Sequence, residues 1–379
     1  MSSADIEALD RLLREASTLG AIFGSLPRAS AHDQRTHARK NFTAMAKKVH
    51  PDLVPASLKK RAGEIFQSLT TTWDKAEAAI LDGTYEHAPA PLRAATFSLA
   101  SSKAVYTLRE TAFRSGTSST IYQGVADGAI TGPVLVKIAR QPTSNPHLEN
   151  EARILGIVQD AAPKSPIGVL SAYLPRHLDS FLVEDGARRL RSNAYSLRPG
   201  FVSVRDILDA FPRGSLAPQD AAWIARRVIA QALAAEVLGV VHGSIVPEHV
   251  LIHPLSREPL HIGWGTAQQT GAPSLLRPPP ALRAYYPRDA LDLGPASART
   301  DVYMAATVVQ ELFGGDVVRH TLPKTIPPAI TSLLQKCTAS TPRSRPSGRD
   351  FLDEFTRLIR KEWGRTYRPL VLPVRSRAT

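Results

Sequence analysis

The chain has 379 residues, 43% of them hydrophobic, so a packed core is expected and wholesale disorder is excluded. Lys and Arg total 47 against 34 Asp and Glu, a net charge of +13, and the single cysteine, Cys337, excludes an intrachain disulfide or a cysteine-based zinc site. No apolar run reaches the roughly 18 residues of a membrane span, and the polar start is unlike a secretory signal. A reduced, cytoplasmic protein without a membrane span is expected.

The positive charge is unevenly divided. Residues 1–90 carry a net charge of only +1, so residues 91–379 carry +12. The excess is scattered and lacks the clusters of cations and aromatic side chains with which single-strand binders grip nucleic acid. A nucleic-acid partner is therefore not expected, and salt-dependent retention on DNA or RNA would be needed to indicate one.

The first predicted elements are two amphipathic helices joined by a short turn. Apolar positions follow the helical period over residues 30–49 and again over 56–81. The first helix must stop near His50, because Pro51 disfavours helical geometry in the residue before it. The two apolar stripes can be buried only against each other, which predicts an antiparallel helical hairpin with His50, Pro51 and Asp52 at its tip.

This region resembles the J domain of DnaJ-type co-chaperones in two segments, RKNFTAMAKKVHPDL and KKRAGEIFQSLTTTWDKAEAAILDG. The resemblance implies a J domain over residues 1–86, in which His50, Pro51 and Asp52 stimulate the ATPase of a DnaK-type chaperone. It also implies that a basic helix face docks on the chaperone, consisting of Arg35, Arg39, Lys40, Lys47 and Lys48. An ordinary turn, with Asp52 capping the second helix, is the alternative.

A stretch rich in Pro, Ala and Ser, residues 87–104, has no helical or strand period and is predicted to be a linker. The pattern then changes to short strands followed by helices, which is typical of an α+β arrangement. A basic tail, residues 363–379, ends the chain. The predicted elements are strands over 105–113, 119–128 and 133–140, a helix over 144–160, a hairpin over 180–197 and a helix over 218–238.

Residues 105–362 resemble the protein-kinase fold in six segments that occur in the order of that family. The resemblance implies that Lys137 and Glu151 pair beside the ATP phosphates, that Asp301 supports the catalytic loop and that Arg345 is structural. The expected fold is thus an all-α J domain followed by a two-lobed, kinase-like α+β domain. The six segments are VLVK (134–137), NEARIL (150–155), GVVHGSIVPEHVLI (239–252), HIGWG (261–265), RTDVYMAATVVQELFGG (299–315) and CTASTPRSRPSGRDFL (337–352).

Three catalytic positions depart from the kinase pattern. Ser244 replaces the base, and a neutral hydroxyl cannot accept a proton near neutral pH. His249 replaces a metal-binding Asn, although imidazole suits zinc-like metals better than magnesium, and Gly263 replaces the metal-binding Asp. Of the phosphate-loop glycines only Gly116 remains. We therefore expect a pseudokinase that is not an enzyme and holds no metal.

The combined expectation is a J-domain co-chaperone whose kinase-like module binds a client, a scaffold protein or a nucleotide. ATP binding without magnesium, through Gly116, Lys137 and Glu151, remains open, as does a purely structural Lys137–Glu151 ion pair. Two other functions also stay open. One is an atypical kinase-fold phosphotransferase or nucleotidyl transferase that uses a displaced carboxylate such as Glu248, and the other is a pure interaction protein.

Overall fold

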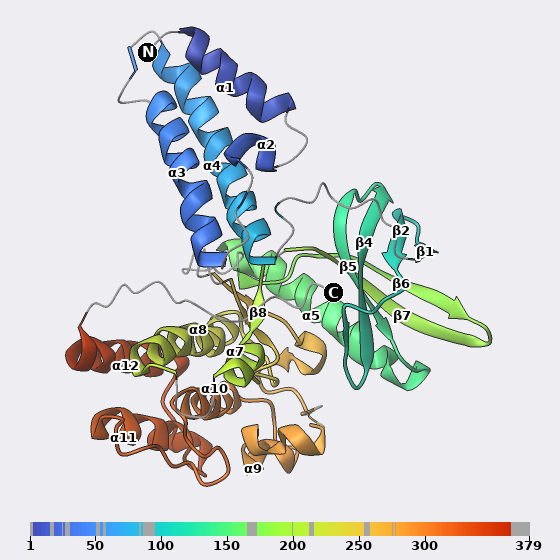
Figure 1. Ribbon diagram of the computed structural model, residues 1–379. Coiled ribbons are helices and arrows are strands. Elements are labelled where there is room, and N and C mark those ends of the chain that lie inside the picture. Colours follow the sequence, from blue (N-terminus) through green and yellow to red (C-terminus); the bar gives the residue numbers. More distant parts are fainter. Residues whose placement is uncertain are drawn as a thin grey trace. The chain divides into compact units, whose positions relative to one another are not determined.

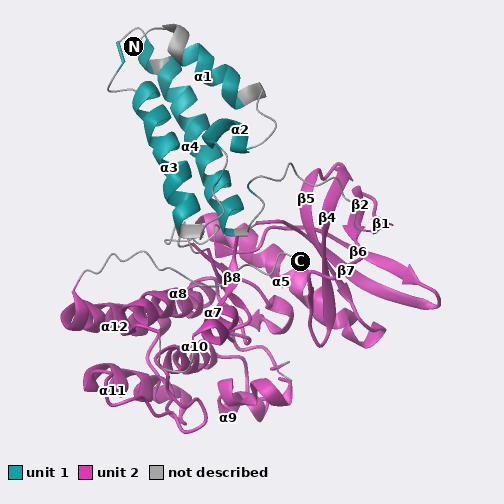
Figure 2. Cartoon of the chain, viewed as in Figure 1, with its two compact units in different colours: residues 1–93, 375–379 teal, residues 94–374 magenta. Residues whose placement is uncertain are grey.

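The chain forms two compact units, shown in Figure 2: residues 1–93 with 375–379, and residues 94–374. The computed structural model describes residues 3–15, 19–24, 26, 31–50, 54–55, 58–82, 85, 95–164, 173–198, 200–211, 216–253, 258–274, 276 and 278–364.

The first unit is helical, and its long helices α3 and α4 pack against each other (Figure 1). The Phe42 ring stacks on Trp73 with 4.8 Å between centroids, and Phe23 meets the same indole edge-on at 5.5 Å. The helices predicted over 30–49 and 56–81 are confirmed to within three residues, because each contributes its apolar stripe to one core. Pro51 and Asp52 lie outside the described residues. The helices are α1 (Ser3–Glu15), α2 (Leu19–Phe23), α3 (Ala31–Val49) and α4 (Lys59–Asp82).

The second unit mixes helix and sheet, and begins with a curled antiparallel sheet of seven strands among the described residues. Alternating burial along β2 places Tyr106 and Leu108 in the core and leaves Val105 exposed on the other face. The strand order is β1-β2-β4-β5-β7-β6, with β3 beside β4. The strands are β1 (Thr96–Ala100), β2 (Ala104–Arg109), β3 (Arg114–Ser115), β4 (Ser119–Gly128), β5 (Gly132–Ala139), β6 (His177–Asp185) and β7 (Arg188–Ser196).

Two details of the sheet differ from the sequence prediction. The predicted linker contains β1, which pairs with β2 so that Phe97 lies opposite Leu108 and packs on the sheet core. Its alternation is short and embedded among Ala and Ser, so the strand becomes apparent only through its partner. The strand predicted over 105–113 ends at Arg109, and the chain turns there toward β3.

The rest of the second unit is mainly helical, with α8 and α10 at the centre of the largest apolar core. Helix α5 packs on β6 and β7 of the sheet. The helices are α5 (Asn145–Ala161), α7 (Val204–Ala210), α8 (Pro218–Val237), α9 (Arg288–Leu291), α10 (Ala298–Leu312), α11 (Pro328–Cys337) and α12 (Gly348–Trp363). Two small antiparallel sheets accompany them, made of β8 (Val202–Ser203), β10 (Val250–Ile252) and β11 (Pro259–His261), and of β9 (Val240–Val241) and β12 (Gln268–Gln269).

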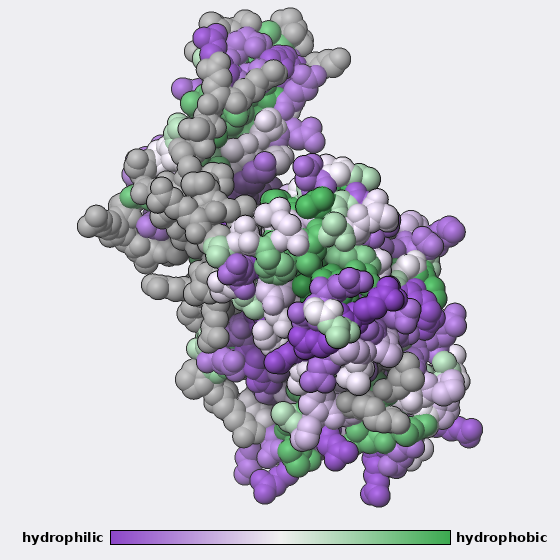
Figure 3. All heavy atoms as spheres, turned by 90° about the vertical axis from the view of Figure 1, so that its right-hand side faces the viewer, coloured by the Kyte–Doolittle hydropathy of each residue, from purple (hydrophilic) through white to green (hydrophobic). Residues whose placement is uncertain are grey.

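Figure 3 turns the sheet side of the second unit toward the viewer, where apolar areas are interrupted by polar ones. The exposed large hydrophobic side chains on these strands include Val105, Val125 and Leu182. None of the helices in the described ranges combines the length and hydropathy needed to cross a membrane.

Candidate functional site

An ion pair joins β5 to α5. The Lys137 ammonium lies 2.7 Å from a Glu151 carboxylate oxygen, and their side chains are only 17% and 4% exposed. Lys137 lies on β5 opposite Asn193 of β7, while Glu151 lies on the buried face of α5 beside Leu148 and Leu155. The helical period that buries the apolar side chains of α5 therefore also turns this carboxylate toward the sheet.

Helix α5 is also tied to the segment that follows β11. The Asn150 side-chain amide donates to the carbonyl oxygens of Gly265 at 3.0 Å and Ala267 at 2.8 Å. Just before them in this segment, Trp264 is fully buried and its indole N–H donates to the His261 carbonyl at 2.7 Å. The segment that holds Gly263 is thus fixed to the helix that carries Glu151.

Asp301, at the start of α10, supports the loop between β9 and β10. Its carboxylate accepts hydrogen bonds from the backbone N–H groups of His242 at 2.7 Å and Gly243 at 2.8 Å. Burial raises the pKa of Asp301 to about 7, although both N–H groups oppose this shift. The His242 ring meets Trp264 edge-on at 4.4 Å, and burial holds its pKa well below the ordinary value. The loop is therefore held by two buried contacts, its backbone N–H groups on Asp301 and the ring of His242 on Trp264.

Ser244 and His249 lie in direct contact in this loop. The Ser244 hydroxyl oxygen is 3.0 Å from His249 Nδ1, and the Tyr286 hydroxyl donates to the same oxygen at 3.4 Å. His249 Nδ1 is also 3.0 Å from the Ser244 carbonyl oxygen. Burial, helped by the nearby charge of Lys137, lowers the pKa of His249, so the imidazole is neutral at pH 7.

Gly263 owes its lack of a side chain to His249. A Cβ atom at position 263 would lie 2.3 Å from His249 Nδ1, closer than any real contact allows. The backbone at Gly263 also has φ of 86°, a left-handed conformation that favours glycine. The two departures from the kinase pattern at positions 249 and 263 are therefore one steric unit, in which the imidazole occupies the space beside the glycine.

Arg345 forms a buried clamp near the end of the chain. Its guanidinium lies 2.5 Å from the Asp289 carboxylate and donates to the carbonyl oxygens of Ala339 and Ser340. Arg288, the neighbour of Asp289, is largely exposed. Arg345 thus ties α9 to the segment before α12.

Gly116 lies in the tight turn between β3 and β4, where its N–H donates to the Ser119 carbonyl at 2.8 Å. No hydrogen bond or ion pair in the described part of the chain joins it to Lys137 or Glu151. The structure therefore brings Lys137 and Glu151 together but leaves Gly116 on a separate turn.

Two clusters contain residues that sequence reasoning missed or placed differently. Glu248, a candidate displaced carboxylate, accepts from Arg205 at 3.2 Å, and Arg205 also pairs with Glu311 at 3.1 Å. Asp179 of β6 is buried and accepts from Ser101 at 2.6 Å and from the Tyr106 hydroxyl. Burial raises the pKa of Asp179, but these hydrogen bonds outweigh it and hold the pKa below the ordinary value. Asp179 could have been found from the sequence, because an acidic residue stands out within an apolar strand.

The cations of α3 differ in their surroundings. Arg35 pairs at 2.6 Å with Glu77, a carboxylate of α4 that is only 9% exposed, so its charge is compensated within the unit. The other four side chains are exposed: Arg39, Lys40, Lys47 and Lys48. At the end of the helix, the His50 ring meets Phe66 of α4 edge-on at 5.2 Å.

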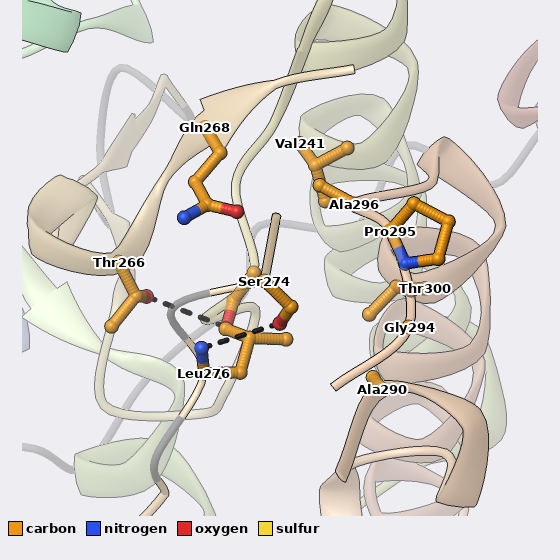
Figure 4. Close-up of a pocket in the computed structure, with 11 residues that line it drawn as sticks. Val241, Thr266, Gln268, Ser274, Leu276, Ala290, Gly294, Pro295, Ala296 and Thr300 are labelled. Atoms are coloured by element: carbon orange, nitrogen blue, oxygen red, sulfur yellow. Dashed lines mark hydrogen bonds between the residues drawn. The ribbon is translucent and has the colours of Figure 1, made fainter. Parts of the chain in front are cut away.

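A small pocket of about 260 Å³ lies next to the loop that Asp301 supports (Figure 4). Gly243, Gln268 and Pro295 are among its lining residues, and no charged side chain lines it. Those 260 Å³ include space that is open to solvent, and the enclosed part, about 10 Å³, has room for about one water molecule. The hydroxyl of Ser244 and the imidazole of His249 do not line this pocket.

Comparison with known proteins relates part of this chain to a kinase. No known family profile matches. The serine/threonine-protein kinase PkaA of Streptomyces coelicolor is 27% identical over 154 residues, which cover 35% of this chain and 28% of that kinase. The chain thus spans less than a third of that protein's length. This similarity points to a kinase-like domain.

The similarity also corrects one expectation. The prediction that the protein is not an enzyme is wrong. The relative is a protein kinase, and the similarity therefore points to a kinase-like enzyme. The physical reason is that replacement of the carboxylates removes one catalytic arrangement only. A hydroxyl at Ser244 and a neutral imidazole at His249 remain in contact in the same loop.

Proposed function

We propose that residues 105–362 form a two-lobed, kinase-like module that binds a nucleoside triphosphate and transfers its phosphoryl group. The Lys137–Glu151 ion pair carries this proposal, because it presents a fixed ammonium beside the sheet. A positioned cation stabilises the charge of phosphate oxygens. The similarity to PkaA supports the same assignment.

The side chains near this pair suit a nucleotide that does not depend on magnesium. Position 263 offers no side-chain oxygen, and His249 offers a nitrogen, whereas magnesium prefers oxygen ligands. Lys137 is then the cation that compensates the phosphates. We expect ATP to bind with similar affinity in the presence of magnesium and of a chelator.

Calorimetric titration of the full chain with ATP tests this proposal, with magnesium and with a chelator. Lys137→Ala should lower the affinity at least tenfold, whereas Lys324→Ala, which removes an exposed lysine elsewhere in the unit, should leave it unchanged. Transfer of labelled phosphate from ATP to casein should likewise be lost in Lys137→Ala and retained in Lys324→Ala. Equal ATP affinity of the wild type and Lys137→Ala would refute the proposal.

For the first unit we propose the J-domain function, stimulation of the ATPase of a DnaK-type chaperone. The supporting observation is the exposed cations of α3, which lead to His50 at the end of the helical hairpin. Such a row of like charges steers association with an acidic surface. In this proposal the kinase-like unit adds contact with a client or scaffold protein.

Single-turnover ATPase measurements with a DnaK-type chaperone test this second proposal. His50→Gln should remove the stimulation, while His37→Gln, at an exposed histidine of α3, should retain it. Circular dichroism should show equal helicity in both variants. Stimulation that persists in His50→Gln would contradict a J-domain function.

A further inference from the structure

A row of directly paired residues crosses the sheet and includes Lys137. Arg114 of β3 lies opposite Ile121 of β4, which in turn lies opposite Lys137 of β5. The next residue in the row is Asn193 of β7, opposite Lys137. Side chains at directly paired positions point to the same face of a sheet. Asn193 is fully buried, whereas the Lys137 side chain is 17% exposed and the Arg114 side chain 48%. Arg114 is therefore a second cation on the face that carries Lys137, at the end of the row nearer to solvent.

The Arg114 side chain reaches from the sheet to helix α7. Its guanidinium donates to an Asp206 carboxylate oxygen at 2.7 Å. The same oxygen accepts hydrogen bonds from Ser203, at 2.6 Å from the hydroxyl and at 3.0 Å from the backbone N–H, in the capping box of α7. Burial raises the pKa of Asp206, but the hydrogen bonds from Ser203 and the charge of Arg114 outweigh it and hold the pKa below the ordinary value. Asp206 is thus a fixed anion that holds the guanidinium.

The turn that follows Arg114 is fastened to the end of the strand that carries Lys137. The Arg140 backbone N–H donates to the Ser118 carbonyl at 3.0 Å, and the Arg140 guanidinium donates to the Gly116 carbonyl at 3.1 Å. Neighbouring strands lie about 4.8 Å apart, so the backbones of Arg114 and Lys137 are about 10 Å apart across β4. Both long cationic side chains therefore border the same stretch of the sheet.

The partner of Arg114 resembles a phosphate group in its chemistry. A guanidinium presents five N–H donors in a planar fork that fits the oxygen atoms of carboxylates and phosphates alike. The ion pair with Asp206 is partly exposed, and exposed ion pairs contribute little to stability. A phosphate carries more negative charge and more acceptor oxygens than a carboxylate. A phosphate chain beside Lys137 can therefore compete with Asp206 for the guanidinium.

We propose that Arg114 binds the phosphates of the nucleoside triphosphate, and that its guanidinium exchanges Asp206 for them when the nucleotide enters. This inference rests on the proposed binding of a nucleoside triphosphate beside Lys137. Before entry, Asp206 holds the guanidinium and competes with the phosphates for it. The two members of the ion pair therefore act in opposite directions: Arg114 contributes to the affinity for the nucleotide, whereas Asp206 lowers it.

Calorimetric titration of the full chain with ATP tests these opposite effects. Arg114→Ala should weaken ATP binding at least about tenfold, because hydrogen bonds between charged groups are lost. Asp206→Asn should strengthen ATP binding, by up to about fivefold, because the amide keeps an acceptor oxygen for Ser203 but loses the charge that competes for Arg114. Arg188→Ala is the control and should leave the affinity unchanged, since it breaks a similarly exposed arginine's ion pair with Asp185 at the β6–β7 turn.

Titrations with adenosine and with inorganic triphosphate show whether the effect of Arg114 depends on phosphate. Arg114→Ala should bind adenosine as the wild type does and bind inorganic triphosphate at least about tenfold more weakly. An equal loss of affinity for adenosine would overturn the inference, because the substitution would then disturb the site as a whole. Increased ATP affinity in both Arg114→Ala and Asp206→Asn would also overturn it, because the ion pair would then only obstruct entry.

The same titrations separate this inference from the nucleotide function itself. ATP affinity that falls in Lys137→Ala but not in Arg114→Ala overturns the inference and leaves the nucleotide proposal standing. Inorganic triphosphate that binds through Arg114, in a wild type that binds no ATP, supports Arg114 as a phosphate ligand and refutes the nucleotide function alone. A wild type that binds neither ATP nor inorganic triphosphate overturns both.

Discussion

Substitution of Gly263 by alanine probes how tightly the loop around His249 is packed. The change requires a side chain at a residue with φ of 86° and places its Cβ 2.3 Å from His249 Nδ1. The structure also offers a matched control, Gly271, whose φ is 85° and whose added Cβ would meet nothing within 4 Å. The two glycines share the backbone conformation and differ in surroundings.

The expected cost follows from these two contributions. A left-handed conformation costs a non-glycine residue about 1–2 kcal/mol. Forcing an extra carbon into a packed site costs about 1–3 kcal/mol more, because the imidazole must shift from its contact with Ser244. We therefore expect Gly263→Ala to lower the free energy of unfolding by about 2–5 kcal/mol, and Gly271→Ala by only about 1–2 kcal/mol.

Urea unfolding of a double-mutant cycle with His249→Ala isolates the steric part. Once the imidazole is removed, Gly263→Ala should cost no more than Gly271→Ala, so the two substitutions should couple favourably by about 1–3 kcal/mol. Additive effects in the cycle would refute the conclusion that His249 and Gly263 form one steric unit. So would equal costs of the two glycine substitutions in the wild-type background.

Three further predictions concern buried groups. Lys137→Met should cost about 3–5 kcal/mol of stability by leaving buried Glu151 without its cation, and adding Glu151→Leu should recover much of it in thermal melts; a fully additive double variant would contradict this. Burial lowers the pKa of His261 from 6.5 to about 3, so the unfolded chain takes up a proton that the folded chain refuses as the pH falls through 6.5. His261→Leu should therefore gain about 2 kcal/mol relative to the wild type between about pH 7 and pH 5, and a constant difference in urea titrations would refute it. Trp73→Ala should cost about 3–5 kcal/mol and speed hydrogen exchange in α3 and α4, with α8 as the unaffected internal control.

Local patterns made much of the secondary structure predictable. The helix predicted over 144–160 occurs as α5, and the hairpin predicted over 180–197 occurs as β6 and β7, which turn at Gly186 with φ of 60°. These features depend on residues within one or two turns of each other, so they can be recognised without knowledge of the partner. Strand β1 was missed because its stability comes from β2 and the sheet core.

Candidate site residues were predictable as residue types, but their surroundings were not. The positions of Ser244, His249 and Gly263 are evident from the spacing of one loop and the segment after it. That the ring of His249 fills the space at Gly263 and touches the Ser244 hydroxyl depends on side-chain directions in the folded loop. Pairing of Arg35 with Glu77 similarly required the packing of two helices.

The sequence by itself determined the amphipathic elements and the departures from the kinase pattern, because periodicity and residue identity are local properties of the chain. Only the tertiary structure decided which polar groups are compensated and which meet a reactive partner. Glu248 is neutralised by Arg205, whereas His249 reaches Ser244. The first pairing joins residues 43 positions apart, and the second depends on the side-chain directions within one folded loop. In both, packing at van der Waals distance lets desolvation and steric exclusion set the chemistry of each group.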